Sequence, residues 1–320
     1  RHTRFKCDWS QTCALPICKL ENELFSAEKM ATAAWSQGLM KYPQEDFHKV
    51  MEDLAFSEFH DILPGSAVPE GEEAAVQQIE HGLEILSRLK AQAFFALTGG
   101  EAKAGAGEMP IFVFNPHPFP VRSIVECEFE PWEPNYEKSG FWEPKIAVKG
   151  RDLPSQAEKE ASNISLEWRK KVVFEAELSP SRMNRFDCRL EKADAKPAFA
   201  AREENGFISV LTADLTVLVN TRTGLLDRYA VRGMDLLAPG AFAPLVILDN
   251  ADPWGMKVRS FRKVAGRFAP ASPEEASRFS GLDAGPVPPV RVIEDGAVRT
   301  VIEAVLAYEK SMAVLHYKIP

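Results

Sequence analysis

The chain has 320 residues and a formal net charge of −8; 45% of its residues are hydrophobic and 26% are charged. This balance is typical of an ordinary globular protein, and the length is sufficient for about two domains. The acidic balance excludes a general nucleic-acid or anionic-membrane binder, because both need a basic surface. No uncharged apolar run approaches the ~18–20 residues that a membrane-spanning helix needs.

Three of the five cysteines lie in the first 18 residues, namely Cys7, Cys13 and Cys18. Their spacing contains no C-x2-C pair, so we do not interpret them as a zinc site. Residues 8–17 read DWSQTCALPI, which back-translates closely onto a common sequencing-adapter strand. We therefore interpret residues 1–18 as a non-native, adapter-derived segment, which also lacks the pattern of a secretion signal.

The other two cysteines, Cys127 and Cys188, are interpreted as buried small apolar residues. So few cysteines are consistent with a reducing compartment, and the sequence predicts a cytoplasmic protein. The last residues, Lys318 to Pro320, fall within an alternating strand pattern, and we expect a gene fragment that is open at both ends.

Residues 19–100 predict a helical domain. Apolar residues recur at helical spacing from Leu20 to about Met40, and a second apolar face follows Pro43 and runs toward Phe59. A third helix begins at Pro69, and its apolar seam from Val76 to Leu97 is suited to packing in a bundle. Gly99-Gly100 ends this helix, and the Ala- and Gly-rich residues 101–109 form a linker.

Residues 110–320 predict an antiparallel β-domain. Short strand patterns occupy 111–114, 124–129, 164–168, 171–178, 186–190, 215–219, 225–229, 290–293 and 298–305. We expect a hairpin with an Asp-Gly turn at Glu294-Asp295-Gly296, and a long loop over residues 268–289. The predicted fold class is α+β and multidomain, with a three-helix-bundle segment followed by a large antiparallel β-sandwich.

The segment FHDILPGSAV, residues 59–68, carries the most informative polar pair, His60-Asp61, where the second helix is expected to end. A histidine at a helix C-terminus is stabilised as a cation by the helix dipole, and this structural role is one interpretation. A lone histidine is no metal site, because zinc needs three or four ligands.

The same segment resembles the His-Asp motif of glycoside hydrolase family 38, the α-mannosidases. Four further segments are similar to that family: LFSAEKMATAA to the first helix of its middle helical domain, and FVFNPHPFP, DNADPWGM and VRVIEDGAVRTV to its C-terminal β-domain. The resemblance covers residues 20–320, and the His-Asp-Pro-Gly motif is its most specific part.

The resemblance implies a retaining, zinc-dependent hydrolase of terminal α-mannosyl residues, with a mannose-containing oligosaccharide as its partner. His60 matches one ligand of a single Zn²⁺, and Asp61 matches the acid that hydrogen-bonds mannose hydroxyls. The other metal ligands, the nucleophile and the acid belong to a catalytic α/β domain that has no counterpart in these 320 residues. We therefore expect one wall of an active site, no catalytic residue, and no hydrolysis by the chain alone. Homo-oligomer formation stays open.

Trp254 is a second candidate for sugar binding, because aromatic rings stack on sugars; the alternative is a loop anchor. A competing hypothesis is a non-catalytic carbohydrate-binding module with a helical stalk, in which Trp254 and Trp142 bind sugar and His60 is incidental. A third is a helical interaction protein that uses the seam from Val76 to Leu97. His48 and His81 are interpreted as solvated helix residues, and His117, in a proline-rich turn, has no ligand-spaced partner.

Overall fold

The computed structural model describes residues 14–131, 140–160, 169–249, 260, 262–280 and 285–320. The helices are α1 (Ala14–Ser36), α2 (Gln44–Ser57), α3 (Pro69–Thr98) and α4 (Pro273–Ser280). The strands are β1 (Glu108–Asn115), β2 (Val121–Phe129), β3 (Phe141–Val148), β4 (Arg151–Leu153), β5 (Ser155–Glu158), β6 (Lys170–Leu178), β7 (Arg182–Ala193), β8 (Glu203–Glu204), β9 (Phe207–Leu211), β10 (Leu215–Asn220), β11 (Leu226–Val231), β12 (Met234–Asp235), β13 (Leu245–Ile247), β14 (Val264–Arg267), β15 (Ala269–Pro270), β16 (Val290–Asp295), β17 (Thr300–Tyr308) and β18 (Ser311–Ile319). Helices followed by antiparallel strands confirm the predicted fold class.

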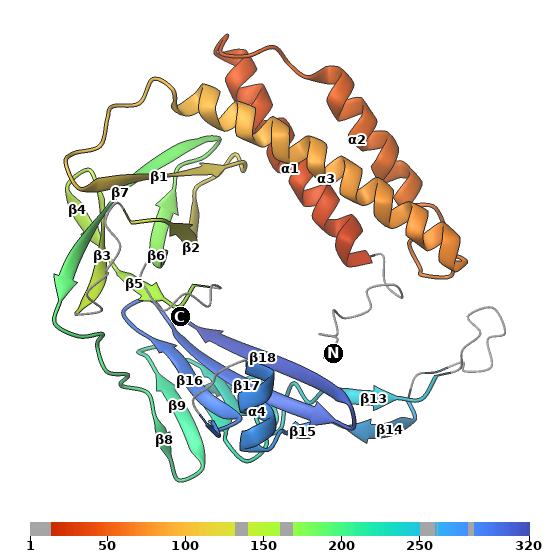
Figure 1. The fold of residues 1–320 in the computed structure, drawn as a ribbon, viewed down its shortest axis with the longest axis vertical. Coiled ribbons are helices and arrows are strands. Elements are labelled where there is room, and N and C mark those ends of the chain that lie inside the picture. The colour runs from red at the N-terminus through yellow and green to blue at the C-terminus, as the bar shows by residue number, and fades with distance from the viewer. Residues whose placement is uncertain (1–13, 132–139, 161–168, 250–259, 261, 281–284) are drawn as a thin grey trace. The chain divides into compact units, whose positions relative to one another are not determined.

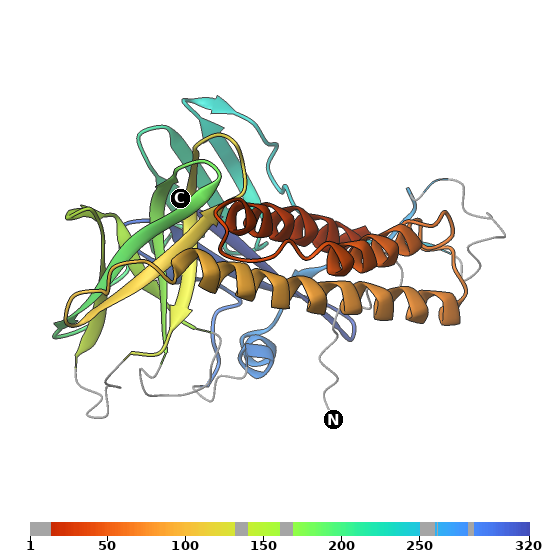
Figure 2. The same cartoon turned by 90° about the horizontal axis from the view of Figure 1, so that it is seen from above.

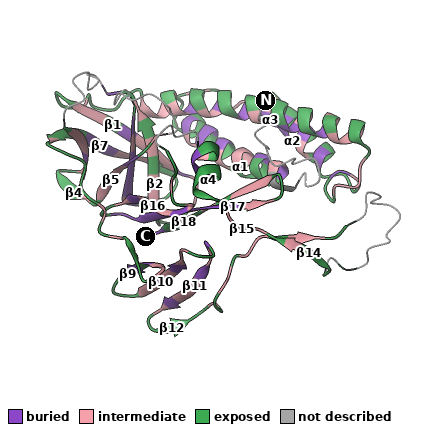
Figure 3. Ribbon diagram, turned by 60° about the horizontal axis from the view of Figure 1, so that its bottom comes forward, coloured by how far each residue is buried: buried purple, intermediate pink, exposed green. Residues whose placement is uncertain are grey.

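The first three helices lie side by side and share one apolar core (Figures 1 and 2). They bury one stripe each, because apolar residues recur three and four positions apart and so fall on one helix face. The fully buried members include Leu20, Val50, Ile79, Leu86 and Leu89. The outer side of α3 stays exposed, as Figure 3 shows.

The first helix differs from its expected bounds at both ends. It begins at Ala14 rather than Leu20, and Ile17 is buried in the helical core. It ends at Ser36 rather than Met40. Two residues after this end, Gly38 adopts a positive φ of 70° and donates its N–H to the Trp35 carbonyl. A glycine in the left-handed region is a common helix stop. The boundary of the adapter-derived segment at residue 18 stays a prediction.

The described strands form five sheets, and their orders are β1-β7-β3-β4, β2-β6-β5, β12-β11-β10-β9-β8, β13-β14, and β15-β17-β16 with β18 also paired to β17. β1 pairs antiparallel with β7 from Glu108↔Arg189 to Asn115↔Arg182. The predicted strand at 164–168 lies outside the described residues.

Two local predictions in the last hundred residues were wrong in detail. The β16–β17 hairpin exists, but Asp295 still belongs to β16 and the connection comprises residues 296–299 rather than a two-residue turn. The predicted loop over 268–289 contains α4. Ser272 and Glu275 cap this helix reciprocally, since each side chain accepts a hydrogen bond from the other's backbone N–H (3.2 and 3.0 Å). This capping box, with Pro273 at the first helical position, explains the helix.

Contacts divide the chain into two compact units. The first contains residues 1–123, 146–153 and 176–189, and the second contains 124–145, 154–175 and 190–320. The main core of the second unit joins β9, β10 and β11 to β16, β17 and β18. Gly224 lies against this core at φ 70°, where a Cβ atom would come within 2.9 Å of Leu306.

Candidate functional site

The His60-Asp61 pair lies in a hydrogen-bonded turn between α2 and α3. Ile62 and Leu63 donate their backbone N–H groups to the Phe59 carbonyl, at 2.9 and 3.0 Å, and Ser66 N–H donates to the Asp61 carbonyl at 3.0 Å. The side chain of Ile62 is buried in the helical core. The buried Ile62 side chain therefore fixes the turn to the helical core, while the His60-Asp61 pair stays at the surface of the turn.

The expectation that α2 ends in the His-Asp pair was wrong. The helix ends at Ser57, whose hydroxyl donates to the Asp53 carbonyl at 2.9 Å. His60 follows three residues later in the turn. The dipole effect falls off within the last helical turn, so it stabilises a cation at His60 less than the sequence led us to expect.

The side chain of His60 is accessible to a ligand. It is 78% exposed, and its Nε2 atom lies 3.8 Å from Asp61 Oδ2. The Phe59 ring packs beside the imidazole, with 4.2 Å between ring centroids. An exposed imidazole beside a carboxylate offers one nitrogen and one oxygen atom to a ligand, which are too few to form a metal site by themselves.

The residues present do not complete a zinc site. In the described part of the chain, no three histidine, cysteine, aspartate or glutamate side chains come close enough together to hold a metal ion. His60 and Asp61 supply at most two donors, whereas zinc takes three or four protein ligands. The chain's own side chains at this turn therefore do not fit a bound zinc without further ligands.

A buried carboxylate, Asp53, was not predicted from the sequence. Asp53 is buried between α2 and α3, and its Oδ2 lies 2.7 Å from Nδ1 of His81. His81 is thus an interhelical partner rather than only a solvated residue, whereas His48 is 77% exposed beside Glu52. The signal was present, because Asp53 follows Val50 by three positions on the apolar face of α2.

The remaining named candidates lie elsewhere in the chain or outside the described residues. Trp254 lies outside the described residues. His117 packs between Phe25 and Phe119, with ring centroids 5.8 and 5.1 Å away. Cys188 is buried, as predicted, and Cys127 is partly buried. Burial raises the pKa of Cys127 to about 11, so its thiol is no nucleophile at neutral pH.

A second polar cluster occupies the second unit. Arg299 donates to both oxygens of Glu158, at 2.6 Å each, and to Glu126 at 2.7 Å. Lys171 lies 3.0 Å from Glu158 and 3.1 Å from Glu126. Gln156 accepts the backbone N–H of Arg299 at 2.9 Å. The charges are mutually satisfied, which is the arrangement of a structural network.

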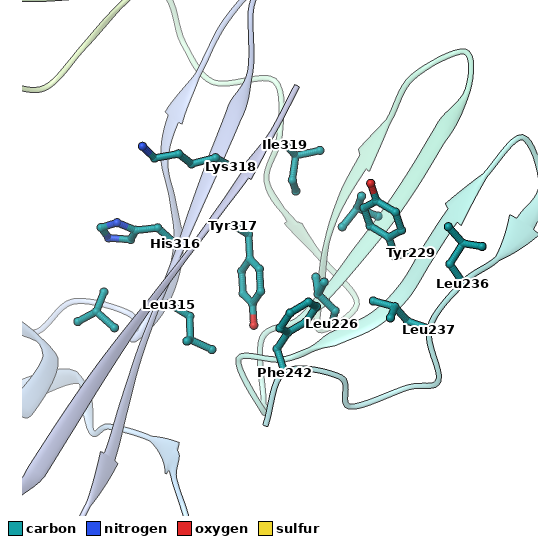
Figure 4. A pocket seen from close by; sticks show the side chains of 12 residues that line it. Leu226, Tyr229, Leu236, Leu237, Phe242, Leu315, His316, Tyr317, Lys318 and Ile319 are labelled. Atoms are coloured by element: carbon teal, nitrogen blue, oxygen red, sulfur yellow. The ribbon is translucent and has the colours of Figure 1, made fainter. Parts of the chain in front are cut away.

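A cavity of about 670 Å³ lies in the second unit (Figure 4). Its lining is mostly apolar, and three of its polar side chains bond to other groups: Tyr317 donates to the Gly224 carbonyl at 2.8 Å, Lys318 donates to Glu126 at 3.1 Å, and His316 lies 3.2 Å from Glu303. Sugar sites need convergent polar groups, so this cavity is a poor carbohydrate site.

No helix in the described part of the chain combines the length and apolar composition that crossing a bilayer requires.

Comparison with known proteins identifies the helical segment. Residues 17–97 match the family model "Alpha mannosidase middle domain". A solved α-mannosidase from Enterococcus faecalis V583 has a similar fold, with a TM-score of 0.61 and 14% sequence identity over 93% of this chain. The match covers 35% of that chain, so this chain spans about a third of the relative's length. A comparison with curated proteins finds no significant match. The resemblance to α-mannosidases is thereby confirmed.

Proposed function

We propose that this chain, which carries an α-mannosidase middle domain, is part of a longer α-mannosidase that hydrolyses terminal α-mannosyl residues. One observation carries the proposal. The exposed His60-Asp61 turn lies inside the segment that matches the middle-domain model. The fold supports it as well, because helices and β-domain together resemble a portion of a solved α-mannosidase.

In this proposal the chain contributes binding groups and no catalytic residue. His60 supplies one nitrogen ligand to a Zn²⁺ ion whose other ligands lie outside these residues. Asp61 accepts hydrogen bonds from hydroxyls of the terminal mannose, as ionised carboxylates do for sugars. Zinc, when bound, supplies a positive charge that orients sugar hydroxyls. The carboxylates of a retaining mechanism would also come from outside this chain.

The natural partner is a mannose-containing oligosaccharide, to which Trp254 contributes a stacking surface. A reducing, cytoplasmic location fits the free thiols of Cys127 and Cys188.

The test replaces His60 in the complete protein, produced from the uninterrupted reading frame. We expect His60→Ala to lower the bound zinc and to reduce kcat/KM for an aryl α-mannoside more than about 100-fold, since even outer-shell partners of metal ligands contribute 10–100-fold. His48→Ala is the matched control, because His48 is equally exposed and also lies 3.8 Å from a carboxylate. We expect His48→Ala to leave both readouts unchanged.

Two outcomes contradict the proposal differently. A complete protein that binds mannosides without hydrolysing them, and independently of zinc, favours the carbohydrate-binding module. An active protein in which His60→Ala behaves like His48→Ala refutes only the role of His60.

A further inference from the structure

Strand β18 has an open edge among the described strands. It pairs antiparallel with β17 along its whole length, from Tyr308↔Ser311 to Thr300↔Ile319. β17 lies between β16 and β18, and no other described strand pairs with β18. Every second N–H and C=O group of a strand points away from its neighbour, so one edge of β18 presents backbone groups with which no described strand pairs.

The apolar cavity follows this edge. Six consecutive residues of β18, Val314 to Ile319, line it. Leu315, Tyr317 and Ile319 point toward the opposite wall, whereas His316 and Lys318 point away from it (Figure 4). The cavity therefore lies over one face of β18, and because residues of the other face also line it, it reaches the edge of the strand.

The opposite wall comes from β10 and β11 and from the segment around Phe242 (Figure 4). Val217, Leu226 and Ile319 belong both to this lining and to the buried core of the unit. The cavity is therefore an outward continuation of the core. At its mouth Leu236 and Phe242 are 53% and 64% exposed.

These features determine which class of ligand fits the cavity. The ligand must form hydrogen bonds with a row of backbone groups on one side and cover apolar side chains on the other. A small apolar ligand would leave the backbone groups unpaired, and a sugar would leave the apolar wall unused. An extended peptide with apolar residues at alternate positions does both.

We infer that an extended segment of the complete polypeptide, outside these 320 residues, pairs with β18 as an added strand and packs alternate apolar side chains against Phe242 and Leu236. This inference rests on the proposed function, in which the chain is part of a longer protein. The similar α-mannosidase offers ample additional chain, because only 35% of it is matched. A strand added at about 4.8 Å from β18 would extend the sheet beside the existing core.

Hydrogen exchange of the complete protein tests the inference. Every second amide between Met312 and Lys318, the half that faces away from β17, is expected to exchange at least about tenfold more slowly than in the 320-residue chain. Phe242→Asp and Leu236→Asp are expected to abolish this protection. Leu211→Asp is the matched control, because Leu211 is 69% exposed on β9 and does not line the cavity.

The β18 amides that face β17 report whether each variant remains folded. They should stay protected from exchange in all three variants, Phe242→Asp, Leu236→Asp and Leu211→Asp. The inference is overturned if the outward amides exchange equally fast in both proteins. Protection that rises with protein concentration would also overturn it, in favour of a second copy of the chain. α-Mannosidase activity of the same samples tests the proposed function separately.

Discussion

At the scale of single residues, the strongest interactions join positions that are far apart in the chain. Arg299 is 5% exposed and lies in the connection between β16 and β17, whereas Glu158 ends β5. Both hydrogen bonds from the Arg299 guanidinium to Glu158 join a cation to an anion, and such charge-assisted bonds are stronger than neutral ones. Burial opposes ionisation of Glu158, yet the hydrogen bond from Arg299 lowers the pKa of this carboxyl overall.

Replacing Arg299 by methionine should destabilise the protein by about 3 kcal/mol, because Glu158 remains buried with only part of its charge compensated. Lys171 still lies 3.0 Å from Glu158, so we expect the low end of the usual range for a broken buried pair. Urea unfolding measures the change. Arg299→Met/Glu158→Met should recover much of the loss, and a double variant less stable than Arg299→Met would contradict this.

Arg228→Met is the matched control for that experiment. Arg228 also bonds a carboxylate, Asp235, at 2.7 Å, but both side chains are exposed. Exposed ion pairs contribute little, so the control should unfold at the wild-type urea concentration.

The candidate site shows how far residue reasoning reaches. His60 and Asp61 were found because their immediate neighbours form a recognisable motif. The Asp53–His81 contact was missed, because it joins residues that are 28 positions apart. Local spacing does not show that α2 and α3 pack with these two faces together.

At the scale of elements, one buried amide fixes the loop that follows β1. Asn115 donates to the carbonyls of Phe119 and Leu178, at 3.0 and 3.1 Å, and accepts the N–H of His117 at 3.0 Å. All three partners are backbone groups, so the side chain substitutes for missing secondary structure.

Asn115→Ala should therefore destabilise the protein by about 2–3 kcal/mol, since three hydrogen bonds are lost and backbone groups are left unsatisfied. Asn115→Asp should be at least as damaging, because a carboxylate cannot donate to the two carbonyls. Thermal unfolding checks both. Phe119→Ala, on the same loop and exposed, should have a small effect; an equal effect would show that the loop's packing rather than the amide matters.

Helices whose apolar residues repeat over many turns were predictable from the sequence, whereas short helices were not. The start of α3 at Pro69 and its end before Gly99 follow from its seam and its stop signals. α4 was interpreted as loop because proline, serine and glycine dominate its surroundings. Its Ser272-x-x-Glu275 capping box was a readable signal that outweighed this composition.

At the scale of the whole molecule, the order of helices and strands was predictable, but the sheets were not. Sheet pairing is non-local: β1 pairs with β7, which is separated from it by five other strands. Alternation shows that a segment is a strand without showing its neighbour. The sequence therefore supports a β-domain but not the division of its described strands into five sheets.

The stability of the whole chain should depend on pH through Glu126. Hydrogen bonds from Arg299, and then from Lys318 and Lys171, lower the pKa of Glu126 to about 2. An unfolded glutamate titrates near ~4.3. The folded pKa is depressed, so this stabilisation is present above pH ~4.3 and is lost as pH falls toward 2.

Glu126→Gln should thus be less stable than the wild type at pH 7, and the difference should vanish as pH approaches 2. Urea unfolding at a series of pH values measures this. Glu128→Gln, also exposed and on the same strand, lies outside the Arg299 cluster and should show no such trend. A difference between Glu126→Gln and the wild type that is constant with pH would refute the linkage.

The length of α3 has a mechanical consequence. Its 30 residues form a rod about 45 Å long, with the turn that carries His60 preceding one end and the segment leading to β1 following the other. A tilt of about 5° about one end carries the other end through about 4 Å, which far exceeds the ~0.5 Å within which a binding group must be held. The close packing at Gly82, where a Cβ atom would come within 3.0 Å of Leu20, fixes the angle of α3. Through this angle it also sets the position of the His60 imidazole, several helical turns away.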